Sequence, residues 1–388
     1  MLRTQQVAAP DALTETLSAA VAEIGGHDVV LYLIDYEHVA LMPHPDALPH
    51  GEQPQVHAVD GSMAGRAFLS STALAAERED GWHVWVPVTE RANRLGVLAM
   101  TLAHWDEDTE RACSELGLAA AYLVMASANY TDLPHLLRRR KDMDLAAEMQ
   151  WFLLPPLSFS TGGATLSGLL EPAYEVGGDC FDYAVNNGVL DIAVFDTVGH
   201  GLTSAVLASL LVGAYRHARR GEEDLAEIAR SIDSAARTFP GQPAFATAVL
   251  AQLQIATGRL TWMTCGHPRP IFVRRGSALQ PMAITPGLPL GLGALGAVVG
   301  EIVETSLEPG DGVLFYTDGV TEARGSADDY FGEDRLRDLL PREHLAGGEP
   351  QDVIRRLARS VVAHSGTRLR DDATLLYLRW DGLAADPA

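Results

Sequence analysis

The stretch from Tyr174 to Ala205 reads YEVGGDCFDYAVNNGVLDIAVFDTVGHGLTSA. It holds two runs rich in Val, Ile, Phe and Tyr on either side of Asn187-Gly188, and its pattern becomes helical after Gly201. Asn-Gly is the strongest short signal for a two-residue type I′ turn, because both central residues need a positive φ. The stretch therefore predicts a β-hairpin followed by a helix.

The predicted turn also sets the pairing of the two strands. Asn186 would pair with Val189, and Asp179 would then lie opposite Asp196. Directly opposed residues of an antiparallel pair have Cβ atoms about 5 Å apart, and like charges placed this way repel each other. A shifted register or a nearby Arg or Lys would remove the conflict. The other interpretation is a divalent cation between the carboxylates, because Mg²⁺ and Mn²⁺ prefer oxygen ligands.

Composition narrows the class of protein. A chain of 388 residues predicts two domains, and 47% hydrophobic with 21% charged residues is typical of a globular protein. The net charge of −22 argues against nucleic acid and against an anionic membrane. The N-terminus lacks an apolar signal core, and the longest near-apolar run, 116–128, is too short to span a bilayer. Three widely spaced cysteines fit a reducing compartment, so we expect a cytoplasmic protein.

The first part of the chain alternates helical and strand patterns. Helices are predicted at 11–24, 62–69 and 107–128, strands at 29–34, 82–88 and 95–102, and a loop at 44–55. With VDGSMAGRAF and VWVPVTERANRLGVLAM at matching positions, residues 10–128 resemble a GAF domain, an α/β sensor. A PAS-like sensor is the alternative, and no residue identifies a ligand.

Residues 129–156 form the predicted helical linker. The stretch 133–154, LPHLLRRRKDMDLAAEMQWFLL, reads as one helix past Pro134, with Leu145, Met149 and Phe152 on one face. Its RRRK run is interpreted as a solvated face. We expect a signalling helix that pairs across a homodimer, and packing against its own domain is the alternative.

The remainder, 160–381, predicts a second domain rich in hairpins. Strands are expected at 166–174, 246–255, 259–264, 271–275, 298–307, 313–317 and 374–380, and helices at 204–219, 224–239 and 333–363, the last broken near 347–350. Gly291, Gly293 and Gly296 spell GxGxxG. A Pro-rich loop precedes them and a strand follows, so the context for dinucleotide binding is missing.

Aspartates recur at the ends of the predicted strands. Asp318 closes one strand, and Asp371 and Asp372 precede the last. If these two strands are antiparallel neighbours, their carboxylates share a sheet edge. Each aspartate alone fits a strand-ending turn. Together with Asp179 and Asp196, and with the Asp371-Asp372 pair counted once, they provide four carboxylate positions, which suit two divalent ions about 3.5–4 Å apart.

The motifs EVGGDCFDY, FDTVGHG, CGHPRP, YTDGVTEA, FGEDRL and RDDATLLYLR follow one another in this order. In this respect residues 160–381 resemble the bacterial PPM/PP2C-type serine/threonine phosphatases of the SpoIIE/RsbU group. The resemblance implies an α-β-β-α sandwich, which makes the whole chain α+β, and dependence on two Mn²⁺ or Mg²⁺ ions. The metal ligands it implies are Asp179, Asp196, the backbone carbonyl of Thr197, Asp318, and Asp371 in preference to Asp372.

The resemblance also implies a reaction and a partner. A metal-activated water would attack phosphorus without a protein nucleophile. His200 and His267 are candidates for the acid that protonates the leaving serine or threonine oxygen, and a structural role in a Gly-His turn is the alternative. The usual partners are phosphorylated anti-anti-sigma proteins of the STAS fold. We therefore expect a sensor-regulated phosphoprotein phosphatase, with a catalytically degenerate docking scaffold as the alternative.

Overall fold

The computed structural model describes residues 9, 12–44, 55–174, 177–240, 244–280, 282–325, 329–366, 369 and 371–383. Most of the predicted loop at 44–55 and Glu175-Val176 of the GGD motif lie outside these ranges. The chain divides into two compact units, Met1–Asp142 and Met143–Ala388.

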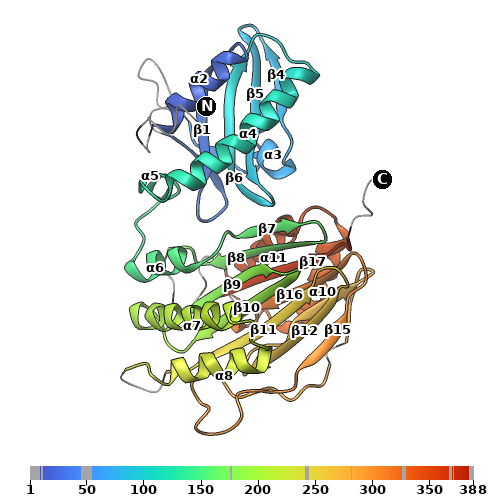
Figure 1. Ribbon diagram of the computed structural model, residues 1–388. Helices are drawn as coiled ribbons and strands as arrows, with labels where there is room; N and C mark the ends of the chain where they lie inside the picture. Colours follow the sequence, from blue (N-terminus) through green and yellow to red (C-terminus); the bar gives the residue numbers. More distant parts are fainter. Residues whose placement is uncertain are drawn as a thin grey trace. The chain divides into compact units, whose positions relative to one another are not determined.

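The N-terminal unit is built on a six-stranded antiparallel sheet in the order β3-β2-β1-β6-β5-β4 (Figure 1). Helices α2 and α4 bury their apolar sides against one face, and α3 packs on the other. The elements are α2 (Leu13–Glu23), β1 (Gly26–Ile34), β2 (Ala40–Pro43), β3 (His57–Ala58), α3 (Met63–Ser70), β4 (Leu74–Arg78), β5 (Gly81–Glu90), β6 (Asn93–Leu102) and α4 (Glu107–Ser127). The predicted α/β class is confirmed, and the GAF-like assignment stays a prediction.

The linker is not the single helix that the sequence predicts. It forms two short helices, α5 (Leu133–Leu137) and α6 (Leu145–Leu153), and residues 138–144 between them are not helical. The prediction of one helix over 133–154 is therefore wrong. The N-cap Asp144 starts α6 anew, because its carboxylate accepts the backbone N–H of Ala147 at 2.7 Å.

The basic run lies against the turn between β1 and β2, and the side chains of Arg140 and Lys141 remain exposed, as a solvated face requires. Arg138 donates from Nε to the Ile34 carbonyl at 3.0 Å. Arg140 and Lys141 form ion pairs with Glu37 at 3.1 and 3.2 Å. These contacts hold the side chains of the run beside the β1–β2 turn, just after α5 ends at Leu137. We call this run, Arg138 to Lys141, the basic clamp.

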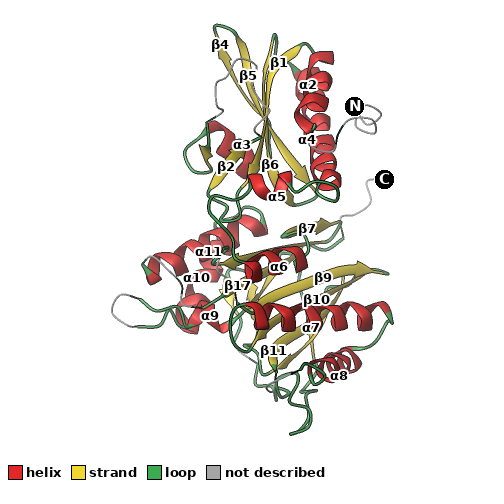
Figure 2. Cartoon of the chain, turned by 90° about the vertical axis from the view of Figure 1, so that its left-hand side faces the viewer, coloured by secondary structure: helices red, strands yellow, loops and turns green. Residues whose placement is uncertain are grey.

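The C-terminal unit is a sandwich of two antiparallel sheets between two layers of helices (Figures 1 and 2). A five-stranded sheet, β15-β12-β11-β10-β9, is covered on its outer face by α7 and α8. A six-stranded sheet, β14-β13-β16-β17-β8-β7, is covered by α10 and α11. The predicted α-β-β-α fold class is confirmed.

Successive residues of each strand point to opposite faces of its sheet, and both faces are apolar. The inner faces of the two sheets share one core, and each outer face packs on its own helices. The elements are β7 (Ser158–Thr161), β8 (Ala164–Glu171), β9 (Asp179–Asn186), β10 (Val189–Thr197), α7 (Leu202–Arg220), α8 (Leu225–Ala236), β11 (Ala246–Gln254), β12 (Arg259–Cys265), β13 (Ile271–Arg274), β14 (Ser277–Ala278), β15 (Val303–Ser306), β16 (Asp311–Tyr316), α9 (Asp318–Thr321), α10 (Glu333–Leu345), α11 (Pro350–Ser365) and β17 (Ala373–Trp380). Across the described ranges, none of the helices has both the length and the apolar character needed to cross a bilayer.

One predicted strand is shorter than expected. The sequence predicts a strand over 298–307, and β15 covers only Val303–Ser306. Residues before it pair with a loop instead: the backbone N–H of Glu301 donates to the Thr285 carbonyl at 2.8 Å. Gly287 permits this approach, because a Cβ there would lie 1.8 Å from the Val298 carbonyl oxygen.

Candidate metal centre

The central hairpin has the predicted turn and register. Asn187 and Gly188 have φ values of 50° and 78°, as a type I′ turn requires. Asn186 pairs with Val189, and Asp179 pairs with Asp196 at the far end of the same ladder. The predicted facing of the two aspartates is confirmed.

Both aspartates lie at the end of the sandwich interior. On β10, Ile192 and Val194 point into the shared core, and Asp196 follows on the same face. On β9, Phe181 points into that core and Asp179 precedes it on the same face. The inner face is therefore apolar along most of its length and becomes acidic at one end.

The second sheet contributes to the same end. β16 and β17 are antiparallel neighbours, so Asp318 after β16 and Asp371-Asp372 before β17 share an edge, as predicted. Gly319 allows the segment after β16 to approach the start of β17 closely, because a Cβ there would lie 1.8 Å from the carbonyl oxygen of Asp372. The carboxylates of the two sheets are thus brought toward one another by the sandwich.

Asp179 is buried, 2% exposed, and anchored by groups that the sequence analysis did not identify. Its Oδ2 accepts a hydrogen bond from the Thr317 hydroxyl at 2.5 Å, and that hydroxyl accepts the backbone N–H of Thr374 at 2.9 Å. Its backbone carbonyl accepts a hydrogen bond from Nε2 of Gln150 in α6. Thr317 lies within the YTDG motif, but nothing in the sequence signals its partner, and Gln150 carries no signal at all.

Asp371 and Asp372 have different surroundings. Oδ2 of Asp372 accepts the backbone N–H groups of Gly177 and Gly178, both at 2.7 Å, so this buried carboxylate ties the Gly-Gly turn to the start of β17. Asp371 is exposed, and its Oδ1 accepts the Asp372 N–H at 3.0 Å. Gly178 must be glycine, because a Cβ there would lie 2.1 Å from Oγ1 of Thr197.

Thr197 and the two histidines lie around this cluster. The Thr197 hydroxyl is shared with Ser204 Oγ at 2.5 Å and donates to the Gly178 carbonyl at 3.1 Å, which leaves the backbone carbonyl as the predicted ligand. His200 is exposed on the loop before α7. His267 is 5% exposed, and its Nδ1 lies 2.7 Å from the Thr247 hydroxyl.

The carboxylates act on each other electrostatically. Burial, together with the charges of Asp318 and Asp371, raises the pKa of Asp196 to about 7. Burial and the charge of Asp196 raise the pKa of Asp179 well above its usual range. Burial and the charge of Glu322, which the sequence analysis did not include, raise the pKa of Asp318. The cluster is therefore a concentration of negative charge.

Two observations bear on whether this cluster suits a metal. Among the ion pairs of the described residues, none joins Arg or Lys to Asp179, Asp196, Asp318, Asp371 or Asp372. Within the same residues, no three His, Cys, Asp or Glu side chains are gathered tightly enough to hold one ion. The oxygen donors and the uncompensated charge fit hard divalent cations, although the described residues contain no ready-made group of three such ligands.

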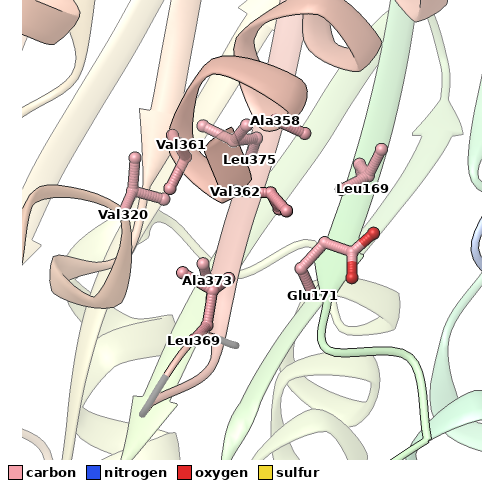
Figure 3. Close-up of a pocket in the computed structure, with 9 residues that line it drawn as sticks. All are labelled: Leu169, Glu171, Val320, Ala358, Val361, Val362, Leu369, Ala373 and Leu375. Atoms are coloured by element: carbon pink, nitrogen blue, oxygen red, sulfur yellow. The ribbon is translucent and has the colours of Figure 1, made fainter. Parts of the chain in front are cut away.

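A pocket near this end of the sheet is of a different kind. Figure 3 shows apolar side chains of α11, β8 and β17, among them Val361, Leu169 and Leu375, with Glu171 as the one charged residue of the lining. Its walls offer no second polar side chain, so it is an apolar gap beside the acidic cluster rather than part of it.

Comparisons with known proteins agree with this architecture. A family model described as Stage II sporulation protein E (SpoIIE) matches residues 186–381. Phosphoserine phosphatase RsbU of Bacillus subtilis is 21% identical over 241 residues, which cover 62% of this chain and 70% of RsbU. Protein IcfG of Synechocystis is 23% identical over 240 residues, which cover 54% of this chain and 37% of IcfG.

Solved structures give the same result for the fold. The RsbU and RsbW domains of Rv1364c from Mycobacterium tuberculosis match at 26% identity and a TM-score of 0.50, covering 59% of this chain and 63% of that chain. The SiaA-PP2C domain of Pseudomonas aeruginosa matches at 24% identity and a TM-score of 0.52, covering 61% and 94%. The C-terminal unit therefore has the fold of a PP2C-type phosphatase domain. The chain belongs to the SpoIIE family.

Proposed function

We propose that the protein is a Mn²⁺- or Mg²⁺-dependent serine/threonine phosphoprotein phosphatase. One observation carries the proposal: Asp179 and Asp196 face each other at the acidic end of the sandwich interior, without a paired Arg or Lys among the described residues. Membership of the SpoIIE family and the likeness to a phosphoserine phosphatase support it.

The donor set suits two ions. Asp179, Asp196, Asp318 and Asp371, with the Thr197 carbonyl, would hold them. Asp372 is better described as the support of the Gly-Gly turn, because backbone N–H groups already occupy its Oδ2. When bound, the ions would supply Lewis-acid stabilisation and lower the pKa of water.

The chain's own groups then have distinct parts in the reaction. Thr317 and Gln150 fix the side chain and the carbonyl of Asp179. Hydrolysis forms a bond from water oxygen to phosphorus and breaks the bond from phosphorus to the serine or threonine oxygen, which takes up a proton. His200, exposed at the loop before α7, is the candidate donor of that proton. His267 is buried, which suits a supporting role better.

The substrate we propose is a phosphorylated STAS-type anti-anti-sigma protein. Among the described residues, no Arg or Lys is paired with the acidic cluster, so no basic side chain is seen there that could bind a free phosphate tightly. This suits an enzyme that recognises a folded partner. We propose further that the N-terminal unit controls this activity and that the protein forms a homodimer.

Hydrolysis of p-nitrophenyl phosphate by the full-length protein tests the activity. We expect turnover with Mn²⁺, loss of turnover with EDTA, and a loss of at least about 100-fold in Asp196→Asn. Asp191→Asn is the matched control, since Asp191 lies on the same strand and its side chain accepts a hydrogen bond from Gln252 at 2.9 Å. It should retain wild-type turnover.

Two results would contradict the proposal in different ways. Turnover that survives both EDTA and Asp196→Asn would refute the metal mechanism. Absence of turnover with Mn²⁺ and Mg²⁺, on the aryl phosphate and on a phosphorylated STAS protein, together with tight binding of that STAS protein, would favour the docking scaffold.

A further inference from the structure

The row of polar residues formed by Asp179 and Asp196 at the end of the inner face continues onto a third strand. Thr247 of β11 pairs directly with Asp196 of β10, which pairs with Asp179 of β9. Directly paired residues point to the same face, with Cβ atoms about 5 Å apart. Val249 and Ala251, the next inward positions on β11, lie in the shared core. Thr247 is therefore a half-buried hydroxyl beside the candidate metal centre.

This hydroxyl is held by a buried histidine. Nδ1 of His267 lies 2.7 Å from Thr247 Oγ1, and the imidazole is 5% exposed. His267 belongs to the CGHP turn after β12, where Gly266 has a φ of 71°. Burial lowers the pKa of His267 to about 3, so the ring is neutral.

The direction of this hydrogen bond depends on which ring nitrogen of His267 carries the proton. Nε2 is buried and makes no hydrogen bond of normal length and angle, and the Tyr316 backbone also interacts with the ring. With the proton on Nδ1, Nδ1–H donates to Thr247 Oγ1, and the hydroxyl proton of Thr247 stays available for a group in the site. With the proton on Nε2, Thr247 would instead donate to Nδ1.

We propose that Thr247 donates a hydrogen bond to a phosphoryl oxygen of the substrate, and that His267 is the positioning residue that orients its hydroxyl. The proposal rests on the proposed phosphatase function and adds to it a neutral hydrogen-bond donor beside a cluster of carboxylates. A donor of this kind stabilises charge on the phosphoryl group without adding to the positive charge that metal ions provide.

Four variants test the pair. Thr247→Val removes the hydroxyl and keeps the shape, and the next inward position on the same strand is the apolar Val249. Thr247→Ser restores the hydroxyl. His267→Asn keeps an N–H donor near the position of Nδ1, and the double variant Thr247→Val/His267→Asn tests whether the residues act together. Thr261→Val is the control, because Thr261 lies on β12 of the same sheet, one position from the inward-facing Trp262.

We expect kcat for p-nitrophenyl phosphate to fall about 10- to 100-fold in Thr247→Val, with KM within about threefold. Thr247→Ser and Thr261→Val should stay within about threefold of wild type. The double variant should lose no more than about twofold beyond Thr247→Val, because the two residues act as a unit. Titration calorimetry with inorganic phosphate and Mn²⁺ should show about fivefold weaker binding by Thr247→Val.

The results separate this inference from the proposed function. If Thr247→Val retains the full turnover of the wild type, the proposed role of Thr247 is wrong and the phosphatase proposal is unaffected. If the wild type shows no turnover, unchanged phosphate affinity in Thr247→Val would overturn the inference by itself. Equal losses in Thr247→Val and Thr247→Ser would mean that the pair only maintains packing, and this too would contradict the proposal.

Discussion

At the scale of single residues, Asp196 links the candidate metal centre to the stability of the fold. Its pKa is raised to about 7 by burial and by Asp318 and Asp371. A carboxyl with a raised pKa in the folded state binds its proton more tightly there than in the unfolded chain. Its contribution to stability is fully present below the unfolded pKa and is lost as pH rises through about 7.

This linkage predicts a pH dependence of the metal-free protein. In EDTA, the thermal midpoint of the wild type should fall as the pH rises from about 5 to about 8. Asp196→Asn should flatten this fall and have the higher midpoint at the upper pH, because it removes one of the repelling charges. Thermal unfolding followed by circular dichroism measures both.

The control for this experiment is Asp334→Asn on the exposed side of α10, which should follow the wild-type curve. Addition of Mn²⁺ should raise the wild-type midpoint at pH 8 and leave that of Asp196→Asn nearly unchanged. Parallel curves for the wild type and Asp196→Asn in EDTA would show that Asp196 is not part of a repelling cluster.

At the scale of elements, the central hairpin was predictable and the linker was not, for physical reasons. Asn187-Gly188 has a strong local conformational preference, so the turn alone fixes the pairing of Asp179 with Asp196. The run RRRK has good helix propensity, and its contacts with Ile34 and Glu37, about a hundred residues away, are not visible in the local sequence.

The unpredicted site contacts have the same explanation. Thr317 meets Asp179 across the two sheets, 138 residues apart in the chain. Thr247 meets His267 where two strand ends converge. Periodicity shows which face a residue occupies, but the residue it meets there depends on how the sheets stack. The ordered motifs predict which segments meet at the site, but the side-chain partners can be identified only from the structure.

The basic clamp supports a prediction at this scale. Asp35 is fully buried, its Oδ1 accepts the N–H groups of Val39 and Ala40 at 2.8 and 2.9 Å, and Arg140 lies 3.7 Å from its Oδ2. Arg140→Ala removes a positive charge that offsets this buried carboxylate. It should lower the protection of the Val39 and Ala40 amides against hydrogen exchange about tenfold, corresponding to about 1.4 kcal/mol.

Arg111→Ala is the matched control, because Arg111 makes an exposed ion pair with Asp108 on α4 of the same unit. Such exposed pairs contribute little, and exchange of the same amides should not change. Equal protection in Arg140→Ala and the wild type would show that the clamp does not stabilise the β1–β2 turn.

At the scale of the whole molecule, α6 is the element through which the N-terminal unit would reach the site. It begins two residues after the boundary between the units and belongs to the C-terminal one. Gln150 contacts the Asp179 carbonyl, and Nε1 of Trp151 donates to the Ala173 carbonyl at 2.8 Å. The segment before β9 is thus held by a helix that follows directly on the basic clamp.

This arrangement separates two effects of shortening the chain. A protein starting at Met143 keeps α6 and its contacts with Asp179, and should retain Mn²⁺-dependent hydrolysis of p-nitrophenyl phosphate. One starting at Ser158 lacks α6 and should lose about tenfold or more, because the backbone at Asp179 loses its support. Gln150→Ala in the full chain should reproduce part of that loss, whereas Glu148→Ala, two residues earlier on the same helix, should not. If the proteins starting at Met143 and Ser158 are equally active, α6 does not support the site, and control by the N-terminal unit would have to act by another route. If instead the protein starting at Met143 differs from the full chain in turnover while binding Mn²⁺ equally, the N-terminal unit changes the arrangement of the site rather than its assembly.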